Sequence, residues 1–212
     1  GCQFRLATSW GTTVVQTDLL GHFNIANLMS ATAALLCQGE RFDNVVKTIE
    51  QVQAVAGRLE VFEFPDHANV VVDYAHTPDA LSQALKALRL HTDGKLWCVF
   101  GCGGDRDKGK RPLMAQAAEQ GADELVITTD NSRSESPSAI AEDIRAGLNH
   151  PENVQDIPDR EQAIRYCLTN AGRNDLILAA GKGHESYQII GEQKINYNER
   201  EAITRLQQEC SK

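Results

Sequence analysis

Four short polar sequences contain most of the residues in this chain that could bind a ligand or do chemistry. They are Asp73–Asp79, Gly101–Arg111, Asp130–Glu135 and Gly181–Glu185. The second reads G-x-x-x-x-G-K from Gly104 to Lys110, which is the start of a phosphate-binding P-loop. A P-loop continues with Ser or Thr, whose hydroxyl binds the Mg²⁺ of the nucleotide, but Arg111 stands here. The pattern alone therefore leaves the ligand of this loop open.

The residue types in these sequences indicate a ligand that carries both signs of charge. Cations are supplied by Arg106, Lys108, Lys110, Arg111, Arg133 and Lys182. Asp130, Asn131 and Glu185 supply acceptors that suit an ammonium group. Because Arg can bind a carboxylate through two parallel hydrogen bonds, a cleft with both sets suits the zwitterionic end of an amino acid. An internal network of ion pairs among the same residues is the alternative.

The elements that must position these residues are strands and helices in alternation from Arg58 onward. Strand-like runs are Leu59–Phe64, Val70–Tyr74, Leu96–Phe100, Leu125–Thr129, Val154–Ile157 and Leu176–Ala180. Helical patterns cover Asp79–Leu90, Leu113–Gln120, Ser138–Leu148, Glu161–Asn170 and Glu199–Glu209. Several strands are apolar without alternation, as expected where helices cover both faces of a sheet. We predict an α/β fold with an open, mostly parallel Rossmann-like sheet, whose ligands bind beyond the carboxyl ends of the strands.

Residues 1–56 have a different pattern. Phe4–Thr8 and Thr12–Val15 predict two short strands, and Asn24–Gln38 and Asp43–Val52 predict two helices before Gly57. The chain begins Gly-Cys-Gln-Phe, with neither an initiator Met nor an apolar signal sequence. We interpret it as a piece of a longer polypeptide.

Composition excludes some classes of function. The net charge of −8 over 212 residues argues against a nucleic-acid partner, since phosphate backbones select basic surfaces. No apolar run is long enough to span a membrane. The six cysteines form no C-x-x-C pair and no zinc-ligand spacing, which suits a reducing cytoplasm and predicts no metal site. Cys98 and Cys102 are interpreted as small buried apolar residues.

Five motifs taken together resemble the Mur ligases, and among them the type that adds meso-diaminopimelate. They are Gly-Arg-Leu-Glu at 57–60, Asp-Tyr-Ala-His-Thr-Pro-Asp at 73–79, Phe-Gly-Cys-Gly-Gly-Asp-Arg-Asp at 100–107, Asp-Asn-x-Arg at 130–133 and Gly-Lys-Gly-His-Glu at 181–185. The resemblance covers essentially the whole chain. It implies an ATP-dependent amide ligase of peptidoglycan synthesis that forms an acyl phosphate on UDP-N-acetylmuramoyl-L-alanyl-D-glutamate, which the amine of the diamino acid then attacks.

The resemblance also implies roles for particular residues. The meso-diaminopimelate site would comprise Arg106, Asp130, Asn131, Arg133, Gly181 and Glu185. Arg106 and Arg133 would contact the distal carboxylate, and Asp130 and Glu185 the distal ammonium. Nucleotide contacts would come from Asn24, Asn27, Arg58, Asp73 and His76. The two asparagines could instead cap a helix.

Further positions keep alternative interpretations. On this resemblance the loop that contains Arg106 holds the amino acid, and its P-loop-like spacing is a coincidence. Lys108, Lys110 and Arg111 are either ligand contacts or surface or interdomain charges, and His184 could simply orient its Gly-rich turn. The family usually has Pro where Ser132 stands, so we expect a looser turn there.

The chain contains no genuine P-loop, and it has no match to the family's uridine-binding domain or to its metal ligands. ATP and Mg²⁺ would therefore belong to the full-length enzyme. Residues 1–56 would be the tail of a central ATP-binding domain, and residues 57–212 the C-terminal domain. This chain alone, without the N-terminal and central domains, should ligate nothing. A folylpolyglutamate-synthase-like ligase and a non-catalytic amino-acid-binding module are the alternative functions.

Overall fold

The structure is a computed structural model that describes residues 1–210. The chain divides into two compact units, Gly1–Val55 and the part that follows from Ala56. Within the described residues, no helix combines the length and the apolar character that crossing a membrane requires.

The first unit is an antiparallel strand pair with two helices. Strands β1 (Cys2–Thr8) and β2 (Gly11–Thr17) pair so that Thr8 lies opposite Gly11. Helices α1 (His22–Cys37) and α2 (Phe42–Glu50) follow. Both strands alternate, and their inward residues form a small core with apolar residues of the helices: Leu6, Val15, Leu28, Leu36, Val45 and Ile49. The four elements expected in this region are therefore present, with ends shifted by up to two residues.

The second unit is built on a six-stranded sheet with the order β3-β4-β8-β5-β6-β7. Its strands are β3 (Glu60–Phe62), β4 (Asn69–Asp73), β5 (Leu96–Phe100), β6 (Glu124–Ile127), β7 (Gln155–Asp156) and β8 (Leu176–Ala180). Only β3 is antiparallel to its neighbour; the other pairs are parallel. The mostly parallel sheet expected from the sequence is therefore confirmed, and β5 and β8 have the predicted bounds. Both are buried along their whole length.

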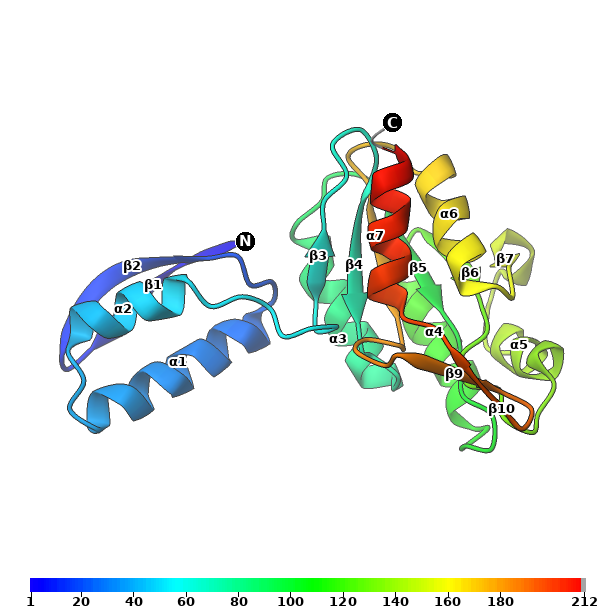
Figure 1. Ribbon diagram of the computed structural model, residues 1–212, viewed down its shortest axis with the longest axis horizontal. Helices are drawn as coiled ribbons and strands as arrows, with labels where there is room; N and C mark the ends of the chain where they lie inside the picture. The colour runs from blue at the N-terminus through cyan, green and yellow to red at the C-terminus, as the bar shows by residue number, and fades with distance from the viewer. Residues whose placement is uncertain (211–212) are drawn as a thin grey trace. The chain divides into compact units, whose positions relative to one another are not determined.

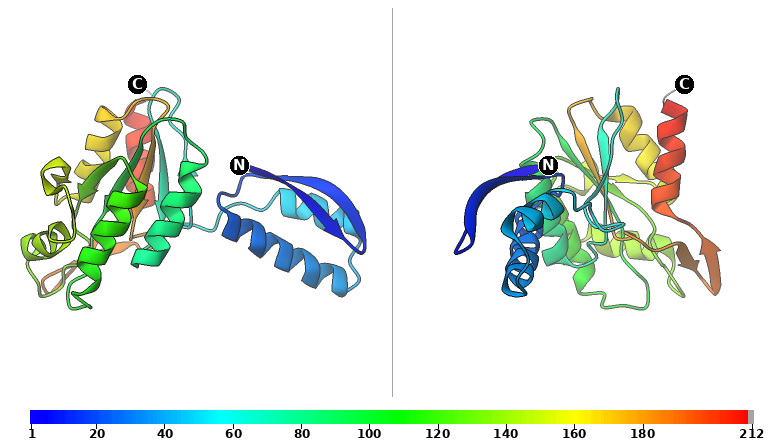
Figure 2. Two further views of the ribbon diagram at one scale, coloured as in Figure 1. Left: turned by 180° about the vertical axis from the view of Figure 1, so that it is seen from behind. Right: turned by 60° about the vertical axis from the view of Figure 1, so that its left-hand side comes forward.

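Helices cover both faces of this sheet (Figures 1 and 2). The helices are α3 (Pro78–Arg89), α4 (Lys110–Gly121), α5 (Pro137–Arg145), α6 (Arg160–Asn170) and α7 (Glu199–Cys210), with a 3₁₀ turn η1 at Pro151–Asn153. α6 and α7 pack together on one face, where their apolar residues meet those of β4, β5 and β8. α3 and α4 pack on the other face, and α5 lies beside α4.

Local capping explains where two of these helices begin. Thr77 accepts a hydrogen bond from Ala80 N at 3.3 Å, and Pro78 occupies the first turn, where it has no helical N–H to lose. Asp159 caps α6 in the same way, through Gln162 N. α4 begins three residues before the predicted Leu113, because Lys110 and Arg111 already close turns onto Asp107 and Lys108. The end of the P-loop-like sequence is therefore helical.

One pair of strands was missed by the sequence analysis. β9 (Tyr187–Ile190) and β10 (Gln193–Asn196) form an antiparallel hairpin with Ile190 opposite Gln193. Its two-residue loop contains Gly191, whose φ of 59° lies in the left-handed region that such turns require. The hairpin brings Ile189 and Arg133 together, since Arg133 N donates to Ile189 O at 3.1 Å.

Candidate functional site

The exits of β4, β5, β6 and β8 meet at the carboxyl edge of the sheet. Their backbones are in direct contact: Gly104 N donates to Asn131 O at 2.8 Å, and Gly181 N donates to Asp73 O at 3.0 Å. A cleft of about 540 Å³ opens between these exits. All six residues expected to bind the amino acid line it: Arg106, Asp130, Asn131, Arg133, Gly181 and Glu185. The topology therefore gathers residues that lie up to 79 positions apart in the sequence.

Three arginines line the cleft, and two of them, Arg106 and Arg133, lie next to Gly103 in the β5 exit. Arg106 is exposed and Arg133 is half-buried. A Cβ built on Gly103 would lie 3.0 Å from Arg133 Nη1 and 3.6 Å from Arg106 Cγ, so the glycine leaves room for both side chains. Arg133 Nη1 donates to Gly104 O at 2.8 Å and to Asn131 O at 3.2 Å. These bonds fix the Arg133 guanidinium at the cleft wall, while Arg106 donates to the adjacent Asp105 O.

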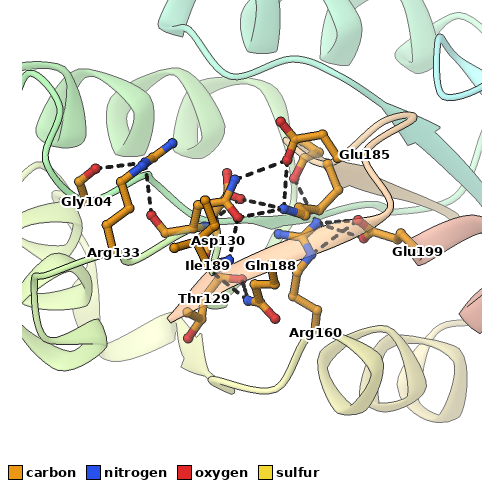
Figure 3. Close-up of polar contacts among 12 residues, drawn as sticks. Gly104, Thr129, Asp130, Arg133, Arg160, Glu185, Gln188, Ile189 and Glu199 are labelled. Carbon is orange, nitrogen blue, oxygen red and sulfur yellow. Dashed lines mark hydrogen bonds and ion pairs between the residues drawn. The ribbon is translucent and has the colours of Figure 1, made fainter. Parts of the chain in front are cut away.

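A buried lysine organises the acidic side of the cleft, where Asp130 and Glu185 lie (Figure 3). Lys182 has no exposed surface, and its ammonium donates to Glu185 Oε2 at 2.8 Å, Asn131 Oδ1 at 3.1 Å and Asp130 Oδ1 at 3.3 Å. Asn131 Oδ1 also accepts from Ile189 N at 2.9 Å. Lys182 was expected among the cations offered to a ligand. It is instead an internal cation that joins the β6 and β8 exits.

Arg111 was expected to be either a ligand contact or a surface or interdomain charge; it lines the cleft, but its charge is paired internally. Its guanidinium is almost fully buried and donates to Glu135 Oε1 at 2.8 Å and to Asp143 Oδ2 at 2.7 Å. Lys108 is exposed and pairs with the same Glu135 carboxylate at 3.0 Å. The hydrogen bonds from Arg111 hold the pKa of Glu135 down at about 2. The internal ion-pair network weighed as an alternative is thus what these residues form.

The turn that contains Ser132 is tightly packed, which corrects the expectation of a loose turn. Ser132 has no exposed surface, and its carbonyl oxygen accepts from Glu135 N at 3.1 Å. Its hydroxyl is buried without a hydrogen-bond partner. The next residue, Arg133, has a φ of 50°, a conformation that costs a non-glycine residue energy. Packing and the Arg133 hydrogen bonds hold this turn in place of a proline ring.

The residues expected to contact a nucleotide fall in different places. His76 lines the cleft, whereas Arg58 and Asp73 do not. Arg58 lies over the Tyr74 ring at 4.9 Å. Burial raises the pKa of Asp73, whose two oxygens accept from Leu59 N at 2.9 Å and Ala75 N at 3.0 Å. Asp73 therefore anchors the chain just after Gly57.

Asn24 and Asn27 belong to the first unit. Both lie within α1, so neither is its N-cap, which is Gly21. The Asn24 amide donates to Leu20 O at 2.8 Å, one turn earlier. Asn27 is exposed. The capping alternative therefore does not describe these asparagines, although Asn24 does bond to the backbone at the start of the helix.

Neither nucleophilic catalysis by a cysteine nor metal binding finds support at the cleft. Burial, helped by the charge of Asp130, raises the pKa of the Cys102 thiol to about 12, so this cysteine is a poor nucleophile. Over residues 1–210, no group of three or more His, Cys, Asp or Glu is arranged to hold a metal ion. The cleft is suited to binding and positioning a charged ligand.

Sequence reasoning missed three residues that shape the cleft. Tyr187, from the unforeseen hairpin, lines it, and its ring lies 5.6 Å from Lys182 Nζ. Gln188 donates to the backbone oxygens of Thr129 and Asp130 and so holds the hairpin to the β6 exit. Tyr74 packs against His184 at 5.1 Å between ring centroids. The apolar pair Ile189-Ile190 before Gly191 was the signal that could have revealed the hairpin.

The match to a family model and the match to a curated relative agree on one family. The family model described as "Mur ligase, glutamate ligase domain" matches residues 57–183. The chain is 49% identical over 201 residues to UDP-N-acetylmuramoyl-L-alanyl-D-glutamate--2,6-diaminopimelate ligase of Haemophilus influenzae, strain KW20 / Rd. That match covers 95% of this chain and 41% of the relative, so the chain spans well under half the length of the curated proteins it matches.

Solved structures agree with this result. A structure of UDP-N-acetylmuramoyl-L-alanyl-D-glutamate--2,6-diaminopimelate ligase matches with a TM-score of 0.77 and 39% identity, over 99% of this chain and 43% of that one. A folylpolyglutamate synthase of Thermotoga maritima matches with a TM-score of 0.65 over 84% of this chain and 40% of that one. Its 18% identity shows a shared fold and nothing more specific.

Proposed function

The chain belongs to the Mur ligase family, and on that basis we propose that it forms the amino-acid-binding part of an ATP-dependent amide ligase. The amino acid is meso-diaminopimelate and the acceptor is UDP-N-acetylmuramoyl-L-alanyl-D-glutamate, in line with the names of relatives that are 49% identical. Residues 1–56 belong in this proposal to a central ATP-binding domain, and residues 57–212 to the C-terminal domain. The ligase needs further domains to act.

The observation that carries the proposal is the opposed charge of the two sides of one cleft. Guanidinium groups of Arg106 and Arg133 line it together with the carboxylates of Asp130 and Glu185. Such a pair of sides suits one end of a diamino dicarboxylic acid, whose carboxylate and ammonium are a few ångströms apart. An uncharged ligand would leave the Arg106 and Arg133 guanidinium groups without a carboxylate to bind. A simple dicarboxylate would meet repulsion from Asp130 and Glu185.

The mechanism assigned to these residues is positioning. Arg106 and Arg133 hold the distal carboxylate, and Asp130 and Glu185 accept from the distal ammonium. The other amine is thereby directed out of the cleft toward an acyl phosphate. Holding two reactants in order can supply a large part of a rate enhancement, and no group of this cleft needs to exchange a proton for that. Asn131 and Gly181 support the acceptors rather than act chemically.

Only some of the residues expected to contact a nucleotide are free to do so. Arg58 and His76 are exposed and could contact phosphate or ribose, whereas Asp73 already accepts two backbone hydrogen bonds. ATP supplies the activation of the acceptor carboxylate. Mg²⁺ has no fitting ligand cluster within residues 1–210, so we derive no step through it from this chain.

Binding provides the first test. The ¹H–¹⁵N NMR spectrum of this chain should shift on titration with meso-diaminopimelate, at resonances from the four strand exits. L-lysine, which has no distal carboxylate, should bind more weakly. Equal binding of both amino acids, or shifts confined to other surfaces, would contradict the proposal.

Ligation provides the second test. We expect no ATP-dependent ligation by this chain alone. A chimera that carries it in place of the matching 41% of the Haemophilus influenzae relative should form product that depends on meso-diaminopimelate. Product formation by the isolated chain would contradict the division into domains. A folded chimera that binds the amino acid without ligating it would favour a non-catalytic module.

A further inference from the structure

The charge of Lys182, in the Gly181–Glu185 sequence, cannot reach a ligand because it is used inside the protein. Its side chain has no exposed surface, and its three ammonium hydrogens have three acceptors, on Asp130, Asn131 and Glu185. A primary ammonium has only three donors, so none remains for another group. Lys182 therefore acts on a ligand only through the residues that it holds.

The effect of Lys182 on the cleft is a matter of charge. Asp130 and Glu185 together carry two negative charges, and the buried ammonium cancels one of them. The neighbouring pair of Arg160 and Glu199, also fully buried, is balanced within itself at 2.7 Å. The acceptor side of the cleft is thus left with one net negative charge. That charge matches a single ligand ammonium.

We propose that Lys182 is a positioning residue that determines specificity, because it sets the acceptor side to one net negative charge and so allows a ligand carboxylate to lie nearby. The inference rests on the proposed function, since it concerns the same amino-acid site. Meso-diaminopimelate is neutral overall, with two carboxylates and two ammonium groups. Lysine carries one net positive charge. A cleft with a second negative charge would therefore shift its preference toward lysine.

Replacement of Lys182 by Met tests this charge effect. Met has a similar length and an apolar character that suits a fully buried position. The K182M cleft would carry two negative charges on its acceptor side, which repel the distal carboxylate. One unit charge several ångströms away in a medium of intermediate dielectric changes a binding ratio on the order of ten-fold or more. We expect the ratio of affinities for meso-diaminopimelate and lysine to fall by about that factor.

A charge-restoring variant distinguishes this role from a purely structural one. Glu185→Gln alone brings the acceptor side to zero net charge and should move the affinity ratio toward meso-diaminopimelate, although both ligands bind more weakly. The double variant, Lys182→Met with Glu185→Gln, returns the acceptor side to one negative charge. Its ratio should recover toward that of the wild type. Loss of packing alone would weaken both ligands equally and would not be rescued.

The experiment is an NMR titration of the wild type and the three variants with each amino acid, in which the same spectra report whether the chain is folded. The order of affinity ratios expected is Glu185→Gln highest, wild type and double variant next, and Lys182→Met lowest. A wild type that prefers meso-diaminopimelate, with ratios that do not follow charge in the variants, overturns the role of Lys182 and leaves the proposed function standing. If Lys182→Met does not fold, the opposite shift in Glu185→Gln decides the matter. A wild type that binds neither amino acid contradicts the proposed function and removes this inference with it.

Discussion

Gly104 is the point at which a single methyl group should push the β5 and β6 exits apart. A Cβ on this residue would lie 2.7 Å from the carbonyl carbon of Ser132 and closer still to its oxygen. Non-bonded carbon atoms pack best at about 3.5–4.0 Å, so the β5 and β6 exits must part by roughly 1 Å. Both partners are backbone atoms, which cannot move aside as a side chain does.

The energetic cost follows from the hydrogen bonds at this contact. Gly104 N donates to Asn131 O, and Gly104 O accepts from Arg133 Nη1, both at 2.8 Å. Loss of the two bonds costs about 1 kcal/mol each, and overpacking adds about 1–3 kcal/mol. We therefore expect Gly104→Ala to destabilise the second unit by about 3–5 kcal/mol. Displacement of Arg133 should also weaken binding of meso-diaminopimelate on the order of ten-fold or more.

A matched control lies five residues further along the same loop. Gly109 has φ −62° and ψ −21°, which alanine adopts freely, and a Cβ built on it would meet only the Asp107 side-chain oxygen, at 3.2 Å. Gly109→Ala should change stability by less than about 1 kcal/mol and leave affinity unchanged. Urea unfolding and NMR titration measure both quantities. A folded Gly104→Ala protein that binds as tightly as Gly109→Ala would refute the idea that this contact sets the width of the cleft.

Three further changes test the charged residues around the cleft. Arg133→Ala should abolish the preference for meso-diaminopimelate over lysine in NMR titrations, since lysine has no distal carboxylate; an unchanged ratio would count against its role. Glu135 has a folded pKa of about 2, below its unfolded value of about 4.3, because of its bonds with Arg111, so its stabilising contribution is present above about pH 4.3 and is lost as pH falls toward 2. The urea midpoint of Glu135→Gln should accordingly fall less than that of the wild type between pH 5 and pH 2.5, and an equal fall would show that the pair contributes nothing. Glu199→Gln, which leaves the Arg160 guanidinium buried without its counter-charge, should cost about 3–5 kcal/mol in urea unfolding, whereas a loss below 1 kcal/mol would contradict the isolation of this pair.

The fold could be predicted from the sequence because the strands of this sheet are marked by composition alone. Leu96–Phe100 and Leu176–Ala180 are uninterrupted apolar runs with polar loops after them, and both are strands with those bounds. The β9–β10 hairpin was harder, since its second strand, Gln193–Asn196, lies on the surface along its whole length and carries no apolar alternation. The contact of this hairpin with the β6 exit, such as the bond from Arg133 N to Ile189 O, joins residues far apart in the sequence and could not be predicted locally.

That the six expected amino-acid contacts would lie together was also predictable, because parallel strands end at one edge, whereas Tyr187 from the hairpin was missed. Whether each charged side chain would face a ligand or be paired internally could not be predicted. Arg111 and Arg106 are five positions apart in one glycine-rich sequence, yet one is buried on two carboxylates and the other is exposed. What separates them is that α4 begins at Lys110, which turns Arg111 toward Glu135 and Asp143. A count of cations in the sequence therefore overstates the charge offered to a ligand.

That distinction bears on how the cleft selects its ligand. Of the six cations in the four exit sequences, Lys182 and Arg111 are paired with acceptors inside the protein. Lys108 pairs with the same Glu135 carboxylate as Arg111. Arg106 and Arg133 remain to face a carboxylate, with Lys110 also at the cleft wall. Buried ion pairs contribute little net stability. Here they instead hold the residues of the cleft walls in place and set the charge that each wall presents. In the proposed function, selectivity between amino acids that differ by one carboxylate would follow from Arg106 and Arg133 on one wall and a single uncompensated negative charge on the other.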